Sequence, residues 1–221
     1  MAKQVFKQFN PIHTSSLLSE ARQVIQNRWI FLTQIGKSNY GIQEQILTHL
    51  FTNPLTKVNV NSIDVYHKAS ILNMYYSTMI WDIQPIVNGI ISLNIDNALL
   101  LAQLGVVQQI ANITAPVRCN LSFASKYCAC HNPSGFPIYD FYVRDYLARV
   151  ISKGNLNNWP KGSISYWRDQ QLRNNYSLYV NAYNAFIAQY NLSSLTYREV
   201  DWYIWTACKC NLNHLNLFSL I

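Results

Sequence analysis

"YDFYVRDYLARVIS", residues 139–152, carries the clearest folding signal in the chain. Its apolar side chains recur at intervals of three and four residues, which places them along one face of an α-helix. The stripe consists of Tyr139, Tyr142, Val143, Tyr146, Leu147, Val150 and Ile151. Strict alternation, the mark of a half-buried strand, is rare and short elsewhere. We therefore expect an all-α protein.

The same spacing predicts helices on both sides of this segment. The first expected helix begins after Thr14 or Ser15, and the next two cover 40–51 and about 62–81. A fourth starts at a cap on Asp96, a fifth ends at Asn132, and a sixth begins at Asp140. The last two run from about Ser163 to Tyr190 and over 195–210. Proline and glycine fall mainly between these segments, where they end helices or shape turns.

The 221 residues are expected to form a single compact helical unit, 1–221, because no repeat and no Pro-rich or Ser/Gly-rich linker divides them. Two lobes are compatible with this length. One would comprise residues 60–155, and the other residues 1–59 together with 156–221. The fold expected is thus a compact, bilobal all-α domain.

No segment predicts export or a membrane span. The first residues lack the apolar core of a signal peptide, and "ALLLAQLGVVQQIANI" (98–113) is interrupted by Gln103, Gln108 and Gln109 before it reaches the roughly 20 apolar residues that a span needs. We expect a cytoplasmic protein. Its five cysteines include two Cys-x-Cys pairs with histidines nearby, but this is not the usual zinc spacing, so neither metal nor cofactor is expected.

The formal charge of +7 is distributed unevenly along the chain. Residues 140–173 contain six Lys or Arg and three Asp. Such a region suits a polyanion, because neutralised phosphates release counterions, and the aromatic residues Trp159, Tyr166 and Trp167 could stack on bases. The alternatives are a solubilising surface and core aromatics. The candidate DNA-binding residues are Arg144, Arg149, Lys153, Lys161 and Arg168.

One lysine and one aspartate could meet across a turn. Lys126 lies on a short predicted helix, "NPSGFP" (132–137) turns the chain, and Asp140 opens the next helix. A helix N-terminus favours an ionised carboxylate, and a desolvated lysine can become a nucleophile. The plainer alternatives are that Asp140 only caps its helix, and that Lys126 is a solvated charge or the ion-pair partner of Asp140.

"ASKYC" (124–128) and "FPIYDFYVRDYL" (136–147) resemble the lysine segment and the aspartate helix start of the helix-hairpin-helix DNA glycosylase superfamily, in its endonuclease III and 8-oxoguanine glycosylase group. The resemblance covers about 60–155. It implies that Asp140 is the catalytic aspartate and that Lys126 corresponds to the lysine that bifunctional members use as a Schiff-base nucleophile. It also implies duplex DNA with a damaged or modified base as partner.

The chain departs from the family pattern in several places. "VRCNLSFASK" (117–126) lacks the hairpin glycines, the connector from Lys126 to Asp140 is short, Arg144 follows Asp140 by four residues, and the four-cysteine iron–sulfur loop is absent. His131 and Asn132 precede the turn and are candidates for contacting a flipped base. The competing hypotheses are a non-catalytic nucleic-acid-binding helical protein and a helical protein-interaction module, for instance in antiviral defence against invading DNA.

Overall fold

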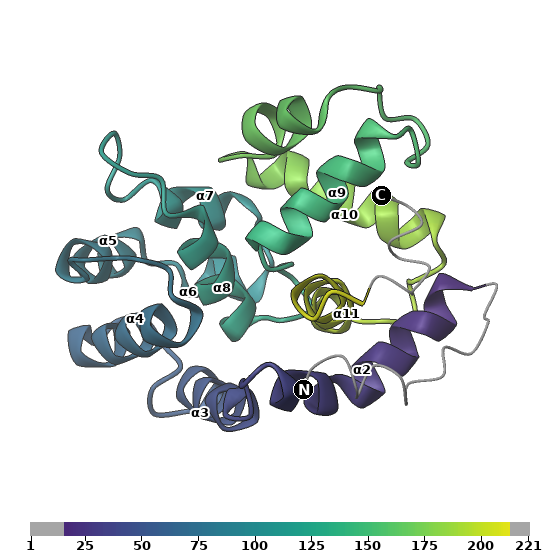
Figure 1. Ribbon diagram of the computed structural model, residues 1–221. Coiled ribbons are helices and arrows are strands. Elements are labelled where there is room, and N and C mark those ends of the chain that lie inside the picture. Colours follow the sequence, from purple (N-terminus) through teal and green to yellow (C-terminus); the bar gives the residue numbers. More distant parts are fainter. Residues whose placement is uncertain (1–15, 213–221) are drawn as a thin grey trace. The chain divides into compact units, whose positions relative to one another are not determined.

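The computed structural model describes residues 16–212, and their regular secondary structure is entirely helical (Figure 1). The all-α prediction is confirmed. The helices are α2 (Leu17–Gln34), α3 (Tyr40–Thr52), α4 (Ser62–Tyr76), α5 (Gln84–Leu93), α6 (Asp96–Leu100), α7 (Gly105–Ala111), α8 (Leu121–His131), α9 (Phe141–Ser152), the π-helix η1 (Tyr166–Gln171), α10 (Tyr176–Gln189) and α11 (Tyr197–Lys209).

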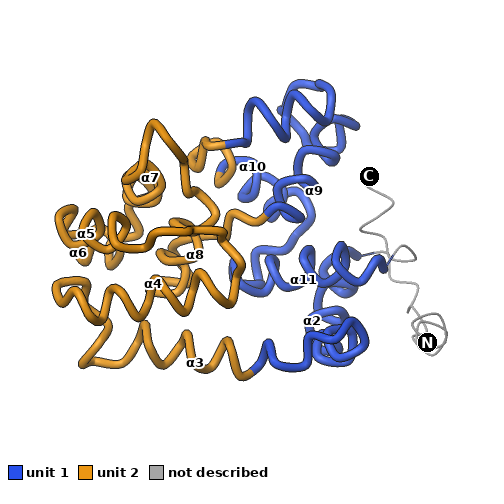
Figure 2. Tube along the Cα trace, turned by 60° about the vertical axis from the view of Figure 1, so that its left-hand side comes forward, with its two compact units in different colours: residues 1–41, 141–173, 181–221 blue, residues 42–140, 174–180 orange. Residues whose placement is uncertain are grey.

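Tertiary contacts divide the chain into two compact units (Figure 2). Of the described residues, unit 1 comprises 16–41, 141–173 and 181–212, and unit 2 comprises 42–140 and 174–180. The chain thus passes from unit 2 to unit 1 directly after Asp140. The lobes expected from the sequence, 60–155 and 1–59 with 156–221, stay a prediction.

Unit 2 is built around α4 and α8. The helix α4 packs against α5 and α8, and α7 packs against α5 and α8. The core between them contains apolar side chains from every one of these helices, including Val65, Ala69, Leu72, Ile86, Ile90, Val107, Ile110, Phe123 and Tyr127. Asn61 caps α4 by accepting a hydrogen bond from the backbone N–H of Ile63, which satisfies one of the unpaired donors of the first turn.

The helix expected over 62–81 ends early, at Tyr76. Ser77 adopts a left-handed conformation with φ 49°. The side chain of Asn73 then closes the turn, because its oxygen accepts from Thr78 Oγ1 and from the N–H of Ile80 while its nitrogen donates to the Ile80 carbonyl. An asparagine that serves three groups of the following turn competes with continuation of the helix.

Unit 1 is built around α11. This helix packs against α2 and α9, and η1 packs against α9. Thr196 and Glu199 form a capping box at the start of α11, where each side chain accepts from the backbone N–H of the other residue. Tyr203 on α11 donates its buried hydroxyl to Glu20 on α2, so the polar end of each side chain is satisfied inside the core.

The single helix expected over 163–190 is wrong, because the chain forms η1 and α10 with a break between them. The N–H of Leu172 donates to the carbonyl of Trp167 five residues earlier, which is the π-helical pattern. Asn174 then turns left-handed at φ 58°, a conformation that asparagine tolerates better than most residues. No helix within 16–212 combines the length and apolarity that crossing a bilayer requires.

Candidate functional site

Lys126 lies on α8 with almost all of its surface covered. The residue is 3% exposed, and its Nζ donates a hydrogen bond of 2.7 Å to Ser122 Oγ, one turn earlier on the same helix. Helical side chains lean toward the helix N-terminus, which explains why Lys126 reaches Ser122. The Nζ also lies 5.4 Å from the ring centre of Tyr76, the last residue of α4. The ammonium is thus held by two helices of unit 2.

Asp140 is the partner that the sequence suggested. Its Oδ2 lies 3.6 Å from Lys126 Nζ, and the side chains of the lysine and the aspartate are 4% and 18% exposed. Asp140 immediately precedes the first residue of α9, where unpaired backbone N–H groups favour a negative charge. The structure therefore brings these two residues together, with the carboxylate as the more accessible member.

Three buried hydroxyl groups hold the backbone that leads into Asp140. Tyr176 donates to the carbonyl of Pro137 at 2.7 Å, and Tyr179 donates to the carbonyl of Ile138 at 2.6 Å. Ser125 Oγ accepts from the N–H of Tyr139 at 2.9 Å. We call Ser125, Tyr176 and Tyr179 the hydroxyl clamp, and none of the three is more than 1% exposed. Three consecutive residues are thereby fixed just before the carboxylate.

Sequence reasoning missed the hydroxyl clamp. Helical spacing places Tyr176 and Tyr179 on the apolar face of the helix expected over 163–190, where phenylalanine or leucine would bury as much surface. A signal was available, because a buried tyrosine nearly always finds a partner for its hydroxyl. The partner itself, a carbonyl about forty residues away, could not be identified from helical spacing.

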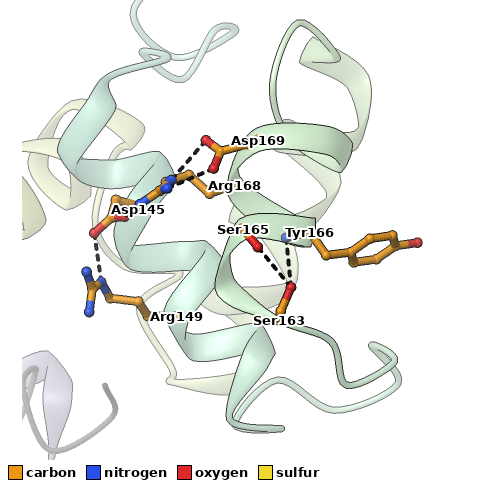
Figure 3. Close-up of polar contacts among 7 residues, drawn as sticks. All are labelled: Asp145, Arg149, Ser163, Ser165, Tyr166, Arg168 and Asp169. Atoms are coloured by element: carbon orange, nitrogen blue, oxygen red, sulfur yellow. Dashed lines mark hydrogen bonds and ion pairs between the residues drawn. The ribbon is translucent and has the colours of Figure 1, made fainter.

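Two of the predicted DNA-binding arginines are engaged with carboxylates (Figure 3). Asp145 on α9 accepts from Arg149 at 2.7 Å through one oxygen and from Arg168 at 3.1 Å through the other. Arg168 also forms a two-point hydrogen bond with Asp169, which raises the pKa of the guanidinium and lowers that of the carboxyl. The two arginines and two aspartates carry no net charge together, and their hydrogen bonds join η1 to α9.

The other predicted basic residues lie in different surroundings. The guanidinium carbon of Arg144 is 5.7 Å from the ring centre of Phe141. Lys153 is exposed at the end of α9. The stem of Lys161 lies over Gly154, where an added Cβ would come within 2.5 Å of Lys161 Cε. Whether these residues contact DNA stays a prediction.

Charge is divided unequally between the units. Among the described residues, unit 1 contains eleven Lys or Arg and five Asp or Glu, a net +6, whereas unit 2 contains four and five, a net −1. The candidate pair Lys126 and Asp140 therefore belongs to a nearly neutral unit. The basic surface that could attract a polyanion belongs to the other unit.

His131 and Asn132, the predicted base contacts, end α8. The centre of the His131 ring lies 4.8 Å from that of Phe51 and 5.2 Å from that of Tyr127. Its Nε2 is buried with no hydrogen-bond partner among residues 16–212. Burial, and secondly the charge of Lys68, lower the pKa of His131 to about 3. Asn132 shapes the turn by donating to the Leu99 carbonyl and accepting from Gly135 N–H. Their role toward a substrate stays a prediction.

A second polar cluster, which the sequence did not indicate, lies inside unit 2. Lys68 is fully buried, and its Nζ donates to the carbonyls of Lys57 and Val58 and to Asn59 Oδ1. Tyr127 donates to the same Asn59 oxygen, and Asp96 accepts from the backbone and side-chain nitrogens of Asn59. Burial lowers the pKa of Lys68 to about 8, while Asp96 acts in the opposite direction.

This cluster also corrects the role expected for Asp96. The residue is the first of α6 rather than its cap, and Ile95 precedes the helix without a side-chain cap bond. The Asp96 carboxylate instead holds the segment around Asn59. Within the described part of the chain, no three His, Cys, Asp or Glu side chains gather as metal ligands, and none of the five cysteines forms a disulfide.

Comparison with known proteins identifies a family. The family model HI_0787_N, described as an N-terminal domain, matches residues 23–135, just over half of the chain. The chain belongs to the HI_0787_N family. The segment matched by HI_0787_N contains Lys126, the Lys68 cluster and His131, and it ends five residues before Asp140.

A relative from Haemophilus influenzae (strain ATCC 51907 / DSM 11121 / KW20 / Rd), described as an uncharacterized protein, is 35% identical over 86 residues. The aligned residues are 38% of this chain and 43% of the relative, so the chain spans less than half of the relative's length. No solved structure matches the chain.

Proposed function

We propose that this protein is a DNA glycosylase that excises a damaged or modified base. The observation that supports the proposal is the meeting of Lys126 and Asp140, with 3.6 Å between Nζ and Oδ2 and with the carboxylate as the more exposed partner. A carboxylate held in place beside a cation, at a helix start, suits a reaction in which positive charge develops next to it.

The role proposed for Asp140 follows from the charge that develops when the base is released. The target nucleotide leaves the base stack, the bond between the sugar C1′ and the base nitrogen breaks, and the sugar acquires oxocarbenium character. A fixed negative charge near C1′ stabilises that cation without having to reorganise during the reaction. The hydroxyl clamp supports this role, because it restrains the three residues before Asp140.

Duplex DNA is the proposed partner, and unit 1 is the proposed source of sequence-independent affinity. Its net +6 supports phosphate binding, which weakens as salt rises. Because Arg149 and Arg168 form ion pairs with Asp145 and Asp169, the remaining candidates for phosphate contact are Arg144, Lys153 and Lys161. A cytoplasmic location accompanies this proposal, since the substrate would be chromosomal or invading DNA.

The test is base release from a panel of duplexes that each carry one damaged or modified base. We expect release from at least one substrate, and Asp140→Asn should lower the rate by roughly 100-fold. Asp82→Asn is the matched control: Asp82 is an exposed carboxylate of unit 2 that accepts from Gln84 N–H, and asparagine can keep that bond. The control should release base at the wild-type rate.

Two results would replace the proposal with the alternatives. Salt-sensitive DNA binding without release from any substrate, unchanged by Lys126→Gln, would indicate a nucleic-acid-binding protein that is not an enzyme. Absence of salt-sensitive DNA binding would indicate a protein-interaction module. Release that persists in Asp140→Asn would refute the assigned role of the carboxylate.

A further inference from the structure

The two members of the candidate pair differ in their access to a substrate. Only 4% of the Lys126 side chain is exposed, against 18% of the Asp140 side chain. A nucleophile must bring its own atom to the sugar C1′, whereas a neighbouring charge acts across a short distance. The carboxylate is therefore the better placed of the two to face a nucleotide.

The surroundings of the Lys126 amine suit a cation. The Nζ has the carboxylate of Asp140 at 3.6 Å, the hydroxyl oxygen of Ser122 at 2.7 Å and the face of the Tyr76 ring at 5.4 Å. An anion, a hydrogen-bond acceptor and an aromatic face each attract an ammonium. A lysine that attacks carbon needs an unprotonated amine and an approach that no neighbour occupies.

We propose that Lys126 is a positioning residue, the fixed counter-cation of Asp140, and that the reaction is a hydrolysis that leaves an intact abasic site. This inference rests on the proposed glycosylase function and decides between its two chemical routes. Ser122 and Tyr76 hold the ammonium, and the ammonium holds the carboxylate.

The hydrolytic step balances without a covalent enzyme intermediate. The bond from C1′ to the base breaks, and its electron pair leaves with the base, which is protonated from solvent. A water oxygen forms the new bond to C1′, and the water proton passes to Asp140 and then to solvent. The products are the free base and a sugar with a hydroxyl at C1′, in an uncut strand.

This product defines the class of reaction that must follow. An abasic site in an intact strand is removed only when a phosphodiester bond beside it is cleaved. A hydrolytic enzyme supplies no such cleavage, so a separate enzyme that cuts at abasic sites must consume the product. The lysine route would instead yield a Schiff base between Nζ and C1′, and strand cleavage by elimination could follow.

The first experiment uses the wild-type protein with a substrate from which it releases base. Borohydride is added during the reaction, and protein joined to DNA is resolved by denaturing electrophoresis. We expect base release at neutral pH with no trapped complex and with strands that break only after alkali. A trapped complex that disappears in Lys126→Arg would overturn the proposal and establish Lys126 as the nucleophile.

The second experiment separates positioning from mere structural support. Lys126→Gln should lower kcat by roughly tenfold to 100-fold with little change in KM, because Asp140 loses the cation that positions it. Lys126→Arg retains the charge and should restore much of the rate. Lys57→Gln, an exposed lysine of the same unit, is the matched control.

Each outcome has a separate meaning. If thermal unfolding shows that Lys126→Gln does not fold, Ser122→Ala provides the milder change, with a smaller loss of kcat and little change in KM. An unchanged kcat in a folded Lys126→Gln protein, or a Lys126→Arg protein that restores none of the lost rate, would overturn the positioning role. No base release from any substrate would defeat the glycosylase function itself, whereas release with a trapped complex would defeat only this inference.

Discussion

Protonation of His131 should destabilise the protein as the pH falls below about 6.5. The ring packs against Phe51 and Tyr127, its Nε2 is buried, and burial lowers its pKa from the 6.5 of an unperturbed histidine to about 3. Between pH 6.5 and 3, His131 is therefore protonated in the unfolded chain and neutral in the folded protein. By linkage, the free energy of unfolding decreases as the pH falls through this window.

The size of the effect follows from the two pKa values. Between pH 7.5 and 4.5 the pH falls about two units below the unfolded-state pKa of 6.5, and at 1.36 kcal/mol per unit the free energy of unfolding falls by about 2.7 kcal/mol. His131→Phe preserves an aromatic ring against Phe51 and Tyr127 and removes the titrating nitrogen. The variant should therefore lose less stability over the same interval, by about 2.7 kcal/mol.

The assay is urea unfolding at pH 7.5, 6.5, 5.5 and 4.5, with the free energy obtained by linear extrapolation. Carboxylates also contribute to the pH dependence, so the quantity of interest is the difference between the wild-type and His131→Phe curves. His67→Phe, at an exposed histidine on α4, is the control and should leave the slope unchanged. Parallel curves for the wild type and His131→Phe would refute the burial argument.

Three further changes test the surroundings of the candidate site. Tyr179→Phe removes one hydroxyl and leaves the Ile138 carbonyl without its donor, so chemical denaturation should show a loss of about 1 kcal/mol, whereas Tyr166→Phe on the exposed face of η1 should show none. Lys68→Met leaves Asn59 Oδ1 and two carbonyls without their shared donor, so the melting curve should show a loss of about 2 to 3 kcal/mol, and a loss near zero would contradict the cluster. Asp145→Asn weakens the link from α9 to η1, so amide exchange in η1 should accelerate while exchange in α4 stays the same.

Much of the helical architecture was predictable because a helix requires apolar residues at a regular spacing in the local sequence. The apolar spacing in 139–152 predicted α9, and the expected end of α8 before Asn132 and the expected helix at 40–51 agree with the structure to within a residue or two. The errors occurred at two turns that contain asparagine. Asn73 ends α4 by bonding to the turn that follows, and Asn174 interrupts the helix expected over 163–190.

The candidate site was predictable only in part. Lys126 and Asp140 were identified because a charged residue is conspicuous in an apolar chain, and a turn between them allowed a meeting. The burial of the lysine, the Ser122 bond and the hydroxyl clamp were not predictable, because each depends on which helices pack together. The ion pairs of Arg149 and Arg168 with Asp145 and Asp169 were also not predictable from the charge pattern, and phosphate binding by the basic region stays a prediction.

By itself the sequence determined an all-helical chain, the places where most helices begin and end, and a small set of charged residues worth testing. These are properties of spacing along the chain, and spacing decides which side chains share a helix face. Only the tertiary structure decided that Asp140 is more exposed than Lys126, and that two tyrosines hold the backbone before it. Burial and long-range hydrogen bonds arise when distant segments pack together, so the local sequence pattern does not predict them.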